Sequence, residues 1–215
     1  MDIISRAQWG ARAWNGQPYS TTLSSRTHFL VHYHGGPPPN ATGTWVPKNV
    51  EAIHLGNGWS GVGYNFLVDQ DGRIYEGRGW SLVGAHCPGR NRDGIGVYVA
   101  IGGNQEPTDA AKASVVWLYR EANRRAGRTL TTGVHGDWYS TACAGPKLTP
   151  WVHAGMPLKG GGTAPRGITT RELQELLGIT ADGIIGPVTE AAVRDLQAAL
   201  GVTVDGDPGP VTMEA

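Results

Sequence analysis

Short apolar runs, bounded by glycine and polar residues, dominate the first two thirds of the chain. Runs of this length that are rich in β-branched and aromatic residues are typical of strands rather than helices. The Asp71-Gly72 pair between the second and third runs predicts a hairpin turn. The last run is apolar on both faces apart from Gly96, which predicts a strand covered on both sides. The four expected strands are Thr27–Tyr33, Tyr64–Val68, Arg73–Glu76 and Ile95–Ile101.

One long stretch has the period of an amphipathic helix. Over Thr108–Ala126 apolar residues recur on one face, Thr108 is placed to cap the first turn, and Gly127 is placed to end the last. A shorter helix is expected near Pro47–Leu55. Strands that alternate with helices predict an α/β or α+β fold, in which helices flank a central mixed sheet.

The C-terminal part of the chain carries two copies of one pattern, spaced 23 residues apart. Each copy reads Leu-Gln-x-x-Leu-Gly-x-Thr-x-Asp-Gly-x-x-Gly-Pro-Val-Thr, starting at Leu173 and at Leu196. Glycine is suited to end a helix and Gly-Pro to begin the next, so we expect the copies to pack together as a small all-α domain. A glycine-rich stretch precedes them and predicts a flexible linker. The predicted division is a domain at 1–158, a linker at 159–167 and a helical domain at 168–215.

Composition separates the same two parts. All eight Trp and all seven His lie before residue 154. Residues 1–159 carry 15 Lys and Arg against 10 Asp and Glu, a net charge of +5, whereas residues 160–215 carry 3 against 8, a net charge of −5. The zero net charge of the whole chain, which argues against nucleic acid as a partner, is therefore a cancellation of two opposite charges.

Targeting and redox signals are few. The longest apolar run, Ile95–Ile101, is far shorter than the ~20 residues of a membrane helix, so no membrane insertion is expected. The first residues lack the basic and apolar regions of a secretory signal, which favours synthesis in the cytoplasm. Cys87 and Cys143 do not make a disulfide framework, and one bridge between them would require an oxidising compartment.

Histidines gather along the first predicted strand. His28 and His32 share one face, and His34 follows at the end of the strand. A strand that runs out into solvent would explain these imidazoles, and so would a ligand that binds them. Much later come His135 and Cys143, whose side chains are both good zinc ligands. His32, His135 and Cys143 would supply the three protein ligands of a catalytic zinc site, although their separation alone is not diagnostic.

Several motifs, in order along the chain, resemble those of the zinc N-acetylmuramoyl-L-alanine amidases. These enzymes are related to the animal peptidoglycan-recognition proteins and to small phage amidases. The resemblance implies the zinc ligands His32, His135 and Cys143. It rests on Ile4–Arg12, Phe29–His32, Gly63–Phe66, Asp71–Arg78, Val83–His86 with Asn91, Gly94–Val97 and His135–Cys143.

The same resemblance assigns further roles. Tyr64 matches the catalytic tyrosine of the family and is the first candidate for the general base, while Thr141 matches a position that is Thr or Lys in relatives. Both hydroxyls would donate to the developing oxyanion. His86 and Asn91 are expected to order a loop beside the cleft, with substrate contact as the alternative. His34, which stands where a small hydroxyl residue is common, is a third candidate for substrate contact.

The repeated pattern resembles the two-repeat peptidoglycan-binding domain of cell-wall hydrolases. Together the resemblances imply zinc-dependent hydrolysis of the amide between the lactyl group of muramic acid and L-alanine, in a layout like that of a phage endolysin. Such a protein is expected to be a monomer, made in the host cytoplasm, that reaches peptidoglycan after release. A recognition protein without activity and a zinc peptidase that cuts within the stem peptide are the alternatives. Cys143 favours an enzyme, because recognition members typically lack the zinc cysteine.

Overall fold

The computed structural model describes residues 1–36, 42–158, 170–181 and 186–206. The chain forms two compact units, Met1–Met156 and Pro157–Ala215. The predicted linker at 159–167 lies outside the described residues. So do the Asp-Gly turn of the first repeat copy and the Gly-Pro-Val-Thr segment of the second.

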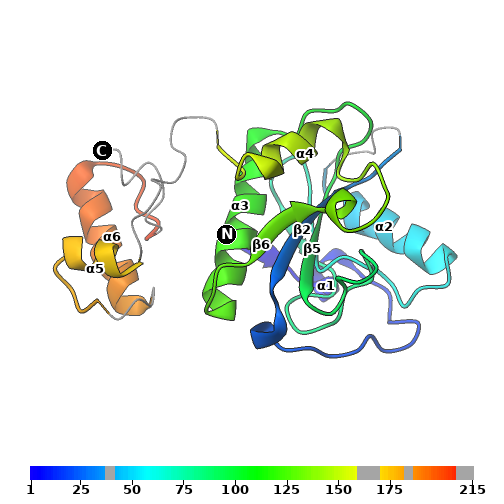
Figure 1. Ribbon diagram of the computed structural model, residues 1–215, viewed down its shortest axis with the longest axis horizontal. Helices are drawn as coiled ribbons and strands as arrows, with labels where there is room; N and C mark the ends of the chain where they lie inside the picture. Colours follow the sequence, from blue (N-terminus) through cyan, green and yellow to red (C-terminus); the bar gives the residue numbers. More distant parts are fainter. Residues whose placement is uncertain (37–41, 159–169, 182–185, 207–215) are drawn as a thin grey trace. The chain divides into compact units, whose positions relative to one another are not determined.

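A mixed sheet of six strands forms the centre of the described part of the first unit (Figure 1). Its order is β1-β4-β3-β5-β2-β6; β3 and β4 are antiparallel, and every other neighbouring pair is parallel. This arrangement confirms the predicted fold class. The strands are β1 (Ile3–Ile4), β2 (His28–Tyr33), β3 (Phe66–Val68), β4 (Ile74–Glu76), β5 (Gly94–Val99) and β6 (Thr131–Val134).

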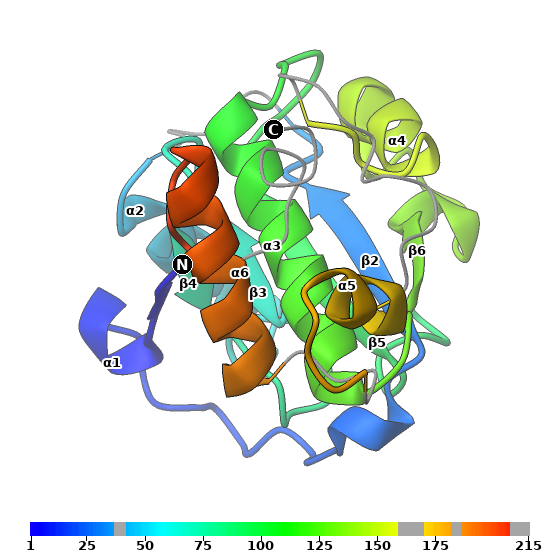
Figure 2. The ribbon, with the colours of Figure 1, turned by 90° about the vertical axis from the view of Figure 1, so that its left-hand side faces the viewer.

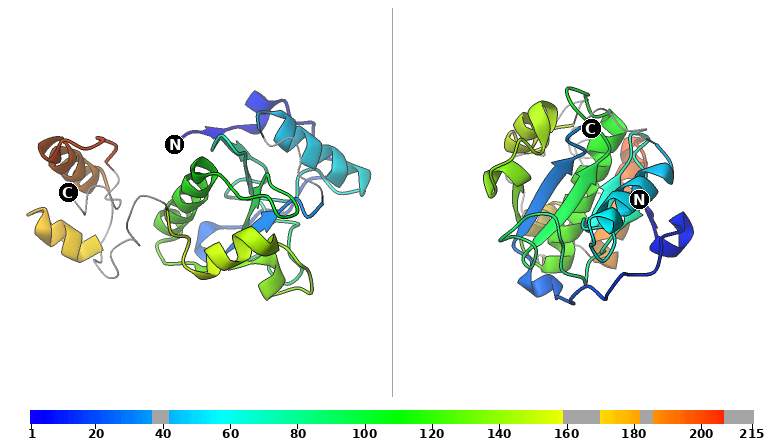
Figure 3. Two further views of the ribbon diagram at one scale, coloured as in Figure 1. Left: turned by 90° about the horizontal axis from the view of Figure 1, so that it is seen from above. Right: turned by 90° about the vertical axis from the view of Figure 1, so that its right-hand side faces the viewer.

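Helices cover both faces of the sheet. Figure 2 looks onto the face covered by α3 (Asp109–Ala126), where the Tyr119 ring lies 5.4 Å from that of Phe29 in β2. On the same face α4 (Gly145–His153) packs against β6 and β2. The opposite face carries α2 (Trp45–Gly56) and the short α1 (Arg6–Trp9) (Figure 3). Two 3-10 turns, η1 (Leu23–Ser25) and η2 (His135–Asp137), complete the described part of this unit.

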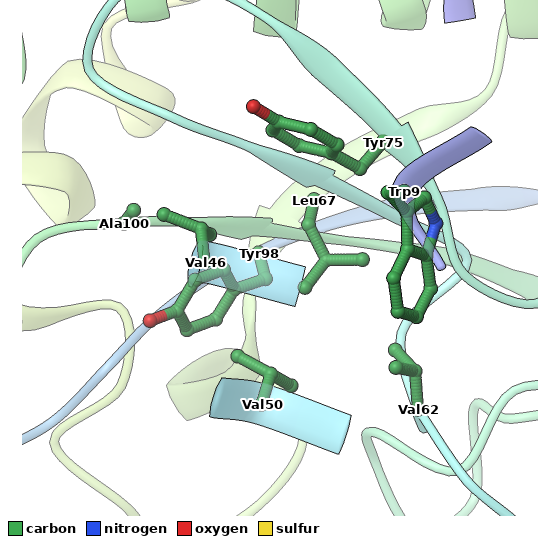
Figure 4. Close-up of a cluster of buried hydrophobic side chains, with 8 residues drawn as sticks. All are labelled: Trp9, Val46, Val50, Val62, Leu67, Tyr75, Tyr98 and Ala100. Carbon is green, nitrogen blue, oxygen red and sulfur yellow. The ribbon is translucent and has the colours of Figure 1, made fainter. Parts of the chain in front are cut away.

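A buried cluster joins α1 and α2 to the sheet (Figure 4). The indole nitrogen of Trp9 donates to the carbonyl of Glu76 at 2.8 Å, which fixes α1 to β4. Burial of large apolar side chains stabilises this layer, at roughly 1.5–3 kcal/mol for each side chain that is fully buried. The cluster therefore forms a rigid support on the sheet face that also carries His32. Its members are Trp9, Val46, Val50, Val62, Leu67, Tyr75, Tyr98 and Ala100.

Local signals in the sequence account for the best-predicted elements. The Thr108 side chain accepts from the Ala111 amide, and Gly127 ends α3 with a φ of 65°, as predicted. Gly72 adopts a φ of 81° in the turn between the antiparallel strands β3 and β4, which confirms the hairpin. Glycine is suited to this left-handed conformation because it has no Cβ.

Other elements depart from the prediction. Tyr64 lies before β3 rather than inside it, and β5 ends at Val99 rather than at Ile101. Both β6, whose sequence is Thr-Thr-Gly-Val, and the proline-containing α4 are absent from the predicted set. Pairing with β2 makes β6 a strand, and packing on the sheet stabilises α4 around Pro150. These are tertiary causes that local propensity does not contain.

The second unit contains α5 (Thr170–Leu176) and α6 (Pro187–Leu200) among its described residues. As the repeat predicts, α6 begins at Pro187 and is capped by Gly201 with a φ of 68°. The Gln197 side chain closes the next turn: its Oε1 accepts from the amides of Asp205 (3.0 Å) and Gly206 (2.8 Å). Gln174 Nε2 donates to Thr189 Oγ1 at 3.0 Å and ties α5 to α6. No helix in the described part of the chain is both long and apolar enough to cross a membrane.

Candidate functional site

The strand β2 places His32 between β5 and the edge strand β6. His32 lies opposite Tyr98 of β5, and its side chain is 0% exposed. Because successive side chains of a strand point to opposite faces, His32 emerges on the face that carries α2, while Phe29 and Val31 face α3. A strand running out to solvent is therefore not the reason for this histidine.

The three predicted metal ligands come together in space. The ligand atoms of His32, His135 and Cys143 all lie within 4.8 Å of one another. His32 Nδ1 is 3.7 Å from Cys143 Sγ, close to the roughly 3.5 Å that tetrahedral zinc geometry requires between a nitrogen and a sulfur ligand. His135 Nε2 is buried and has no hydrogen-bond partner among the described residues. Two imidazoles and a thiol in this arrangement fit a tetrahedral metal ion with an open fourth position.

A tight loop brings Cys143 back beside His135. The Gly136 amide donates to the Cys143 carbonyl at 2.6 Å. A Cβ on residue 136 would lie 2.9 Å from the carbonyl oxygens of both Thr141 and Cys143, so only glycine fits there without displacement. Asp137 supports the turn, because its Oδ2 accepts from the Val134 amide at 2.8 Å.

Burial sets the protonation of the three side chains. It lowers the pKa of His32 well below the usual range, and the neighbouring His86 and His135 lower it further. Burial also lowers the pKa of His135 and raises the pKa of the Cys143 thiol to about 12. The imidazoles therefore keep neutral lone pairs, and the thiol loses its proton only beside a positive charge such as a bound metal ion.

Tyr64 lies directly beside this group. Its ring centroid is 5.1 Å from that of His32, 5.2 Å from that of Tyr98 and 5.4 Å from that of His54. Burial raises the pKa of the Tyr64 hydroxyl, with Cys143 as a further cause. Without a metal ion the hydroxyl therefore keeps its proton, as the predicted role of hydrogen-bond donor requires.

The other predicted residues differ in their surroundings. Thr141 is exposed, and its Oγ1 accepts from the Cys143 amide at 3.3 Å. His34 is half-buried, with its Nδ1 3.0 Å from the hydroxyl of Tyr98. The sequence carries no local signal for this His34–Tyr98 pair, because His34 follows β2 whereas Tyr98 lies on β5, 64 positions later.

The predicted role of His86 and Asn91 in ordering a loop agrees with their contacts. Asn91 Oδ1 accepts from the amides of His86 (2.7 Å) and Cys87 (2.9 Å). The His86 side chain is 7% exposed, and its Nδ1 lies 3.2 Å from His32 Nε2. Burial, followed by the charge of Arg26, lowers the pKa of His86 to about 3. His86 thus touches a predicted ligand, a contact that the sequence did not suggest.

A hollow of about 310 Å³ lies in the first unit, and its lining among the described residues includes neither the three candidate ligands nor Tyr64. One lining residue, Trp59, is connected to Tyr64 through His54, whose ring centroid lies 4.5 Å from that of Trp59 and 5.4 Å from that of Tyr64. The Arg78 guanidinium is held in the wall by hydrogen bonds to the carbonyls of Val62 (2.9 Å) and Val83 (2.7 Å). The lining residues are Gln17, Pro18, Tyr19, Gly58, Trp59, Ser60, Arg78, Val83, Gly84 and Ala85.

Comparison with known families identifies the first unit. A family model described as N-acetylmuramoyl-L-alanine amidase matches residues 10–147, which include the three candidate ligands and Tyr64. The chain belongs to the N-acetylmuramoyl-L-alanine amidase family. A second model, described as a peptidoglycan binding domain, matches residues 170–215 of this family member.

Individual relatives include amidases and recognition proteins. Human N-acetylmuramoyl-L-alanine amidase is 38% identical over 120 residues, or 53% of this chain and 20% of the human protein. The structure of peptidoglycan recognition proteins LCa and LCx with tracheal cytotoxin has a TM-score of 0.62 and 30% identity, covering 70% of this chain and 93% of that one. The structure of the endolysin amidase LysCS of Clostridium intestinale has a TM-score of 0.58 and 26% identity. The match covers 74% of this chain and 97% of LysCS.

The chain matches only part of the full-length proteins it resembles. The match covers 52% of a recognition protein from Drosophila simulans and 20% of the human amidase. The chain thus spans about half the length, or less, of these curated relatives.

Proposed function

We propose that the chain hydrolyses the amide between the lactyl group of muramic acid and L-alanine in peptidoglycan, with zinc held by His32, His135 and Cys143. The observation that carries this proposal is the approach of the three ligand atoms to within 4.8 Å, with Tyr64 packed beside them. The peptidoglycan binding domain that matches residues 170–215 supports the same substrate.

The side chains of this site have distinct tasks. Zinc, when bound, supplies an activated water and polarises the carbonyl to be attacked. The Tyr64 hydroxyl, which keeps its proton, donates a hydrogen bond to the oxygen on which negative charge develops. Thr141 is the second proposed donor, at the exposed rim of the site. The hollow, lined in part by the exposed rings of Trp59 and Tyr19, offers aromatic faces for sugars.

The two units together suit an endolysin-like role. We propose that the helical unit holds the protein on the wall while the first unit cuts, and that the protein acts as a monomer on the bacterial wall after release from the cytoplasm. Similarity to the endolysin amidase of Clostridium intestinale supports this reading. Nucleic acid is not a proposed partner.

A recognition protein without activity is the competing function. Recognition proteins among the relatives, one of them bound to tracheal cytotoxin, share the fold. The presence of Cys143 beside His32 and His135 favours the enzyme, because a binding protein has no need of a complete ligand set.

A pair of cysteine variants tests the proposal. We expect Cys143→Ala to lose bound zinc and to reduce wall hydrolysis on the order of a thousandfold or more, because a ligand to the metal that activates water is gone. Cys87→Ala is the matched control: Cys87 is the other free thiol, it is buried and lies outside the ligand set, and its loss should leave zinc content and hydrolysis near wild type. Hydrolysis by Cys143→Ala at the wild-type rate would refute the zinc mechanism.

The products identify the bond that is cut. An amidase releases new L-alanine amino termini and leaves the glycan strands intact. New amino termini on any other residue of the stem peptide would instead identify a peptidase. Tight peptidoglycan binding without any new termini would identify a recognition protein.

A further inference from the structure

His86 lies behind the metal-ligand group and has no part in the mechanism proposed above. The imidazole of His32 has two nitrogens, and they face opposite ways: Nδ1 lies 3.7 Å from Cys143 Sγ, and Nε2 lies 3.2 Å from His86 Nδ1. Both rings are buried, and their centroids are 5.0 Å apart at an interplanar angle of 75°. The rings meet at a steep angle, and the two facing nitrogens are within hydrogen-bond distance.

The proton positions follow from the chemistry of imidazole. A neutral imidazole carries one N–H and one lone pair. If Nδ1 of His32 offers its lone pair to a metal ion beside Cys143, then Nε2 carries the proton and must donate it to an acceptor. The polar atom placed to accept is His86 Nδ1. His86 in turn must carry its own proton on Nε2, a buried nitrogen that has no hydrogen-bond partner among the described residues.

The surrounding chain holds the His86 ring in one place. A Cβ on Gly84 or on Gly96 would collide with the imidazole carbon Cδ2, so the two glycines form a slot shaped for this ring. Asn91 Oδ1 fixes the backbone of His86 through its amide at 2.7 Å. The buried Arg26 side chain closes the same segment by donating to the carbonyls of Leu82 and Gly94, each at 2.7 Å.

We propose that His86 is a positioning residue of the metal centre. Its Nδ1 accepts a hydrogen bond from His32 Nε2, which fixes the tautomer of His32 and turns Nδ1 toward the metal ion. Partners of this kind around metal-bound histidines typically contribute 10- to 100-fold in affinity or activity, about the effect expected here. The proposal rests on the proposed zinc site, and it replaces substrate contact as the role of His86, whose side chain is only 7% exposed.

Zinc affinity of the full-length protein tests the proposal directly. His86→Leu removes the acceptor and keeps an apolar side chain of similar bulk, and we expect zinc affinity, measured by competition with a chromogenic chelator, to fall by about 10- to 100-fold. His86→Asn places an amide oxygen close to the position of Nδ1 and should restore most of the loss. His28→Leu is the control, because His28 lies on the same strand and face but outside the ligand group.

Two results of this experiment would overturn the proposal. One is wild-type zinc affinity in His86→Leu; the other is an affinity in His86→Asn as low as that of His86→Leu. Circular dichroism of each metal-free variant checks that the fold is intact.

A measurement on the wild-type protein remains decisive if a variant fails to fold. In zinc-loaded protein labelled with ¹⁵N-histidine, nuclear magnetic resonance should find His32 protonated at Nε2 and His86 protonated at Nε2 only. A proton on His86 Nδ1 would overturn the proposal.

These readouts separate this inference from the proposed function. Reduced zinc affinity in His86→Leu, in a protein that releases no L-alanine termini, would uphold the role of His86 and refute the amidase. An active amidase whose zinc affinity does not depend on His86 would uphold the proposed function and refute the role of His86. A protein that binds no zinc would refute both.

Discussion

The two units of the chain differ in how far apart along the sequence their contacting residues lie. In the first unit His32 and Cys143 meet although they lie 111 positions apart, and the sheet that joins them is built from six separate strands. In the second unit Gln197 closes the turn at Asp205, only 8 positions later. The second unit can therefore be read from a local pattern, whereas the candidate site of the first exists only after the fold has formed.

The units also differ in chemistry. Every histidine and tryptophan lies before residue 154, and the charge changes from +5 over residues 1–159 to −5 over residues 160–215. Titratable imidazoles, a metal-ligand set and aromatic rings concentrate in the first unit, while the described part of the second is held by amide side chains and apolar contacts. Each experiment below should therefore affect one unit and spare the other.

After the loss of a metal ligand in Cys143→Ala, the next largest effect is expected from Tyr64→Phe. The variant lacks the hydroxyl that is proposed to donate to the developing oxyanion, so kcat should fall by roughly 10²- to 10³-fold with little change in KM or zinc content. Binding to walls through the second unit should not change. Tyr119→Phe is the control, since its hydroxyl bonds to the Leu130 carbonyl on the opposite face of the sheet. Equal activity of wild type and Tyr64→Phe would remove Tyr64 from the mechanism.

An intermediate effect is expected from acid. Burial, together with the charge of Arg78, lowers the pKa of His54 to about 4, compared with 6.5 for an unperturbed imidazole. The unfolded chain therefore binds more protons between these values, so the stabilising contribution is complete above pH 6.5 and declines as the pH falls toward 4. At pH 5 the loss from His54 is about 2 kcal/mol in the free energy of unfolding.

His54→Asn tests this assignment. Its amide oxygen can still accept from the Gly63 amide, which bonds to His54 Nδ1 at 2.9 Å. Denaturant unfolding of metal-free protein at pH 7 and pH 5 should show a smaller decrease in the variant than in wild type. The second unit, which contains no histidine, should unfold with a weaker dependence on pH over this range. An unchanged decrease in His54→Asn would show that other groups cause the acid sensitivity.

The smallest effect is expected from salt. Bacterial walls carry anionic polymers, so wall binding by residues 1–158 alone should weaken by about tenfold or less as sodium chloride rises from about 0.05 to 0.3 M. Residues 168–215, with their net negative charge, should bind through shape-based contacts that change less. Sedimentation of each unit with purified walls measures both. Salt-independent binding by the basic unit would refute this explanation of the charge division.

Sequence patterns predicted those parts of the fold that local physics determines. The cap of α3 at Thr108, its end at Gly127 and the turn at Gly72 each depend on residues within a few positions of one another. The strand that carries His32 was also predicted, because its run of apolar residues is clear. The meeting of His32 with His135 and Cys143 came from resemblance to a family, since no spacing rule joins such distant positions.

The remaining features of the site depend on strand register and packing. Tyr98 lies beside His32 because β5 pairs with β2 in one particular register, and this also brings the Tyr98 hydroxyl to His34. The contact of the buried His86 with His32 was not predicted, because it joins residues 54 positions apart and depends on how the folded chain packs. A faint signal was present in two glycines, Gly84, which lies two positions before His86, and Gly96, which lies in β5. Glycine within a strand often marks a place where another group packs closely against the backbone.

The slot around His86 limits which substitutions the chain can accept at Gly84, His86 and Gly96. Gly84 and Gly96 have no room for even one added carbon while the imidazole occupies its place. A lineage that enlarged either glycine first would displace the ring, so His86 must become smaller before either glycine can grow. The three positions are therefore coupled: a larger residue at position 84 or 96 is compatible with this packing only when a smaller one stands at position 86.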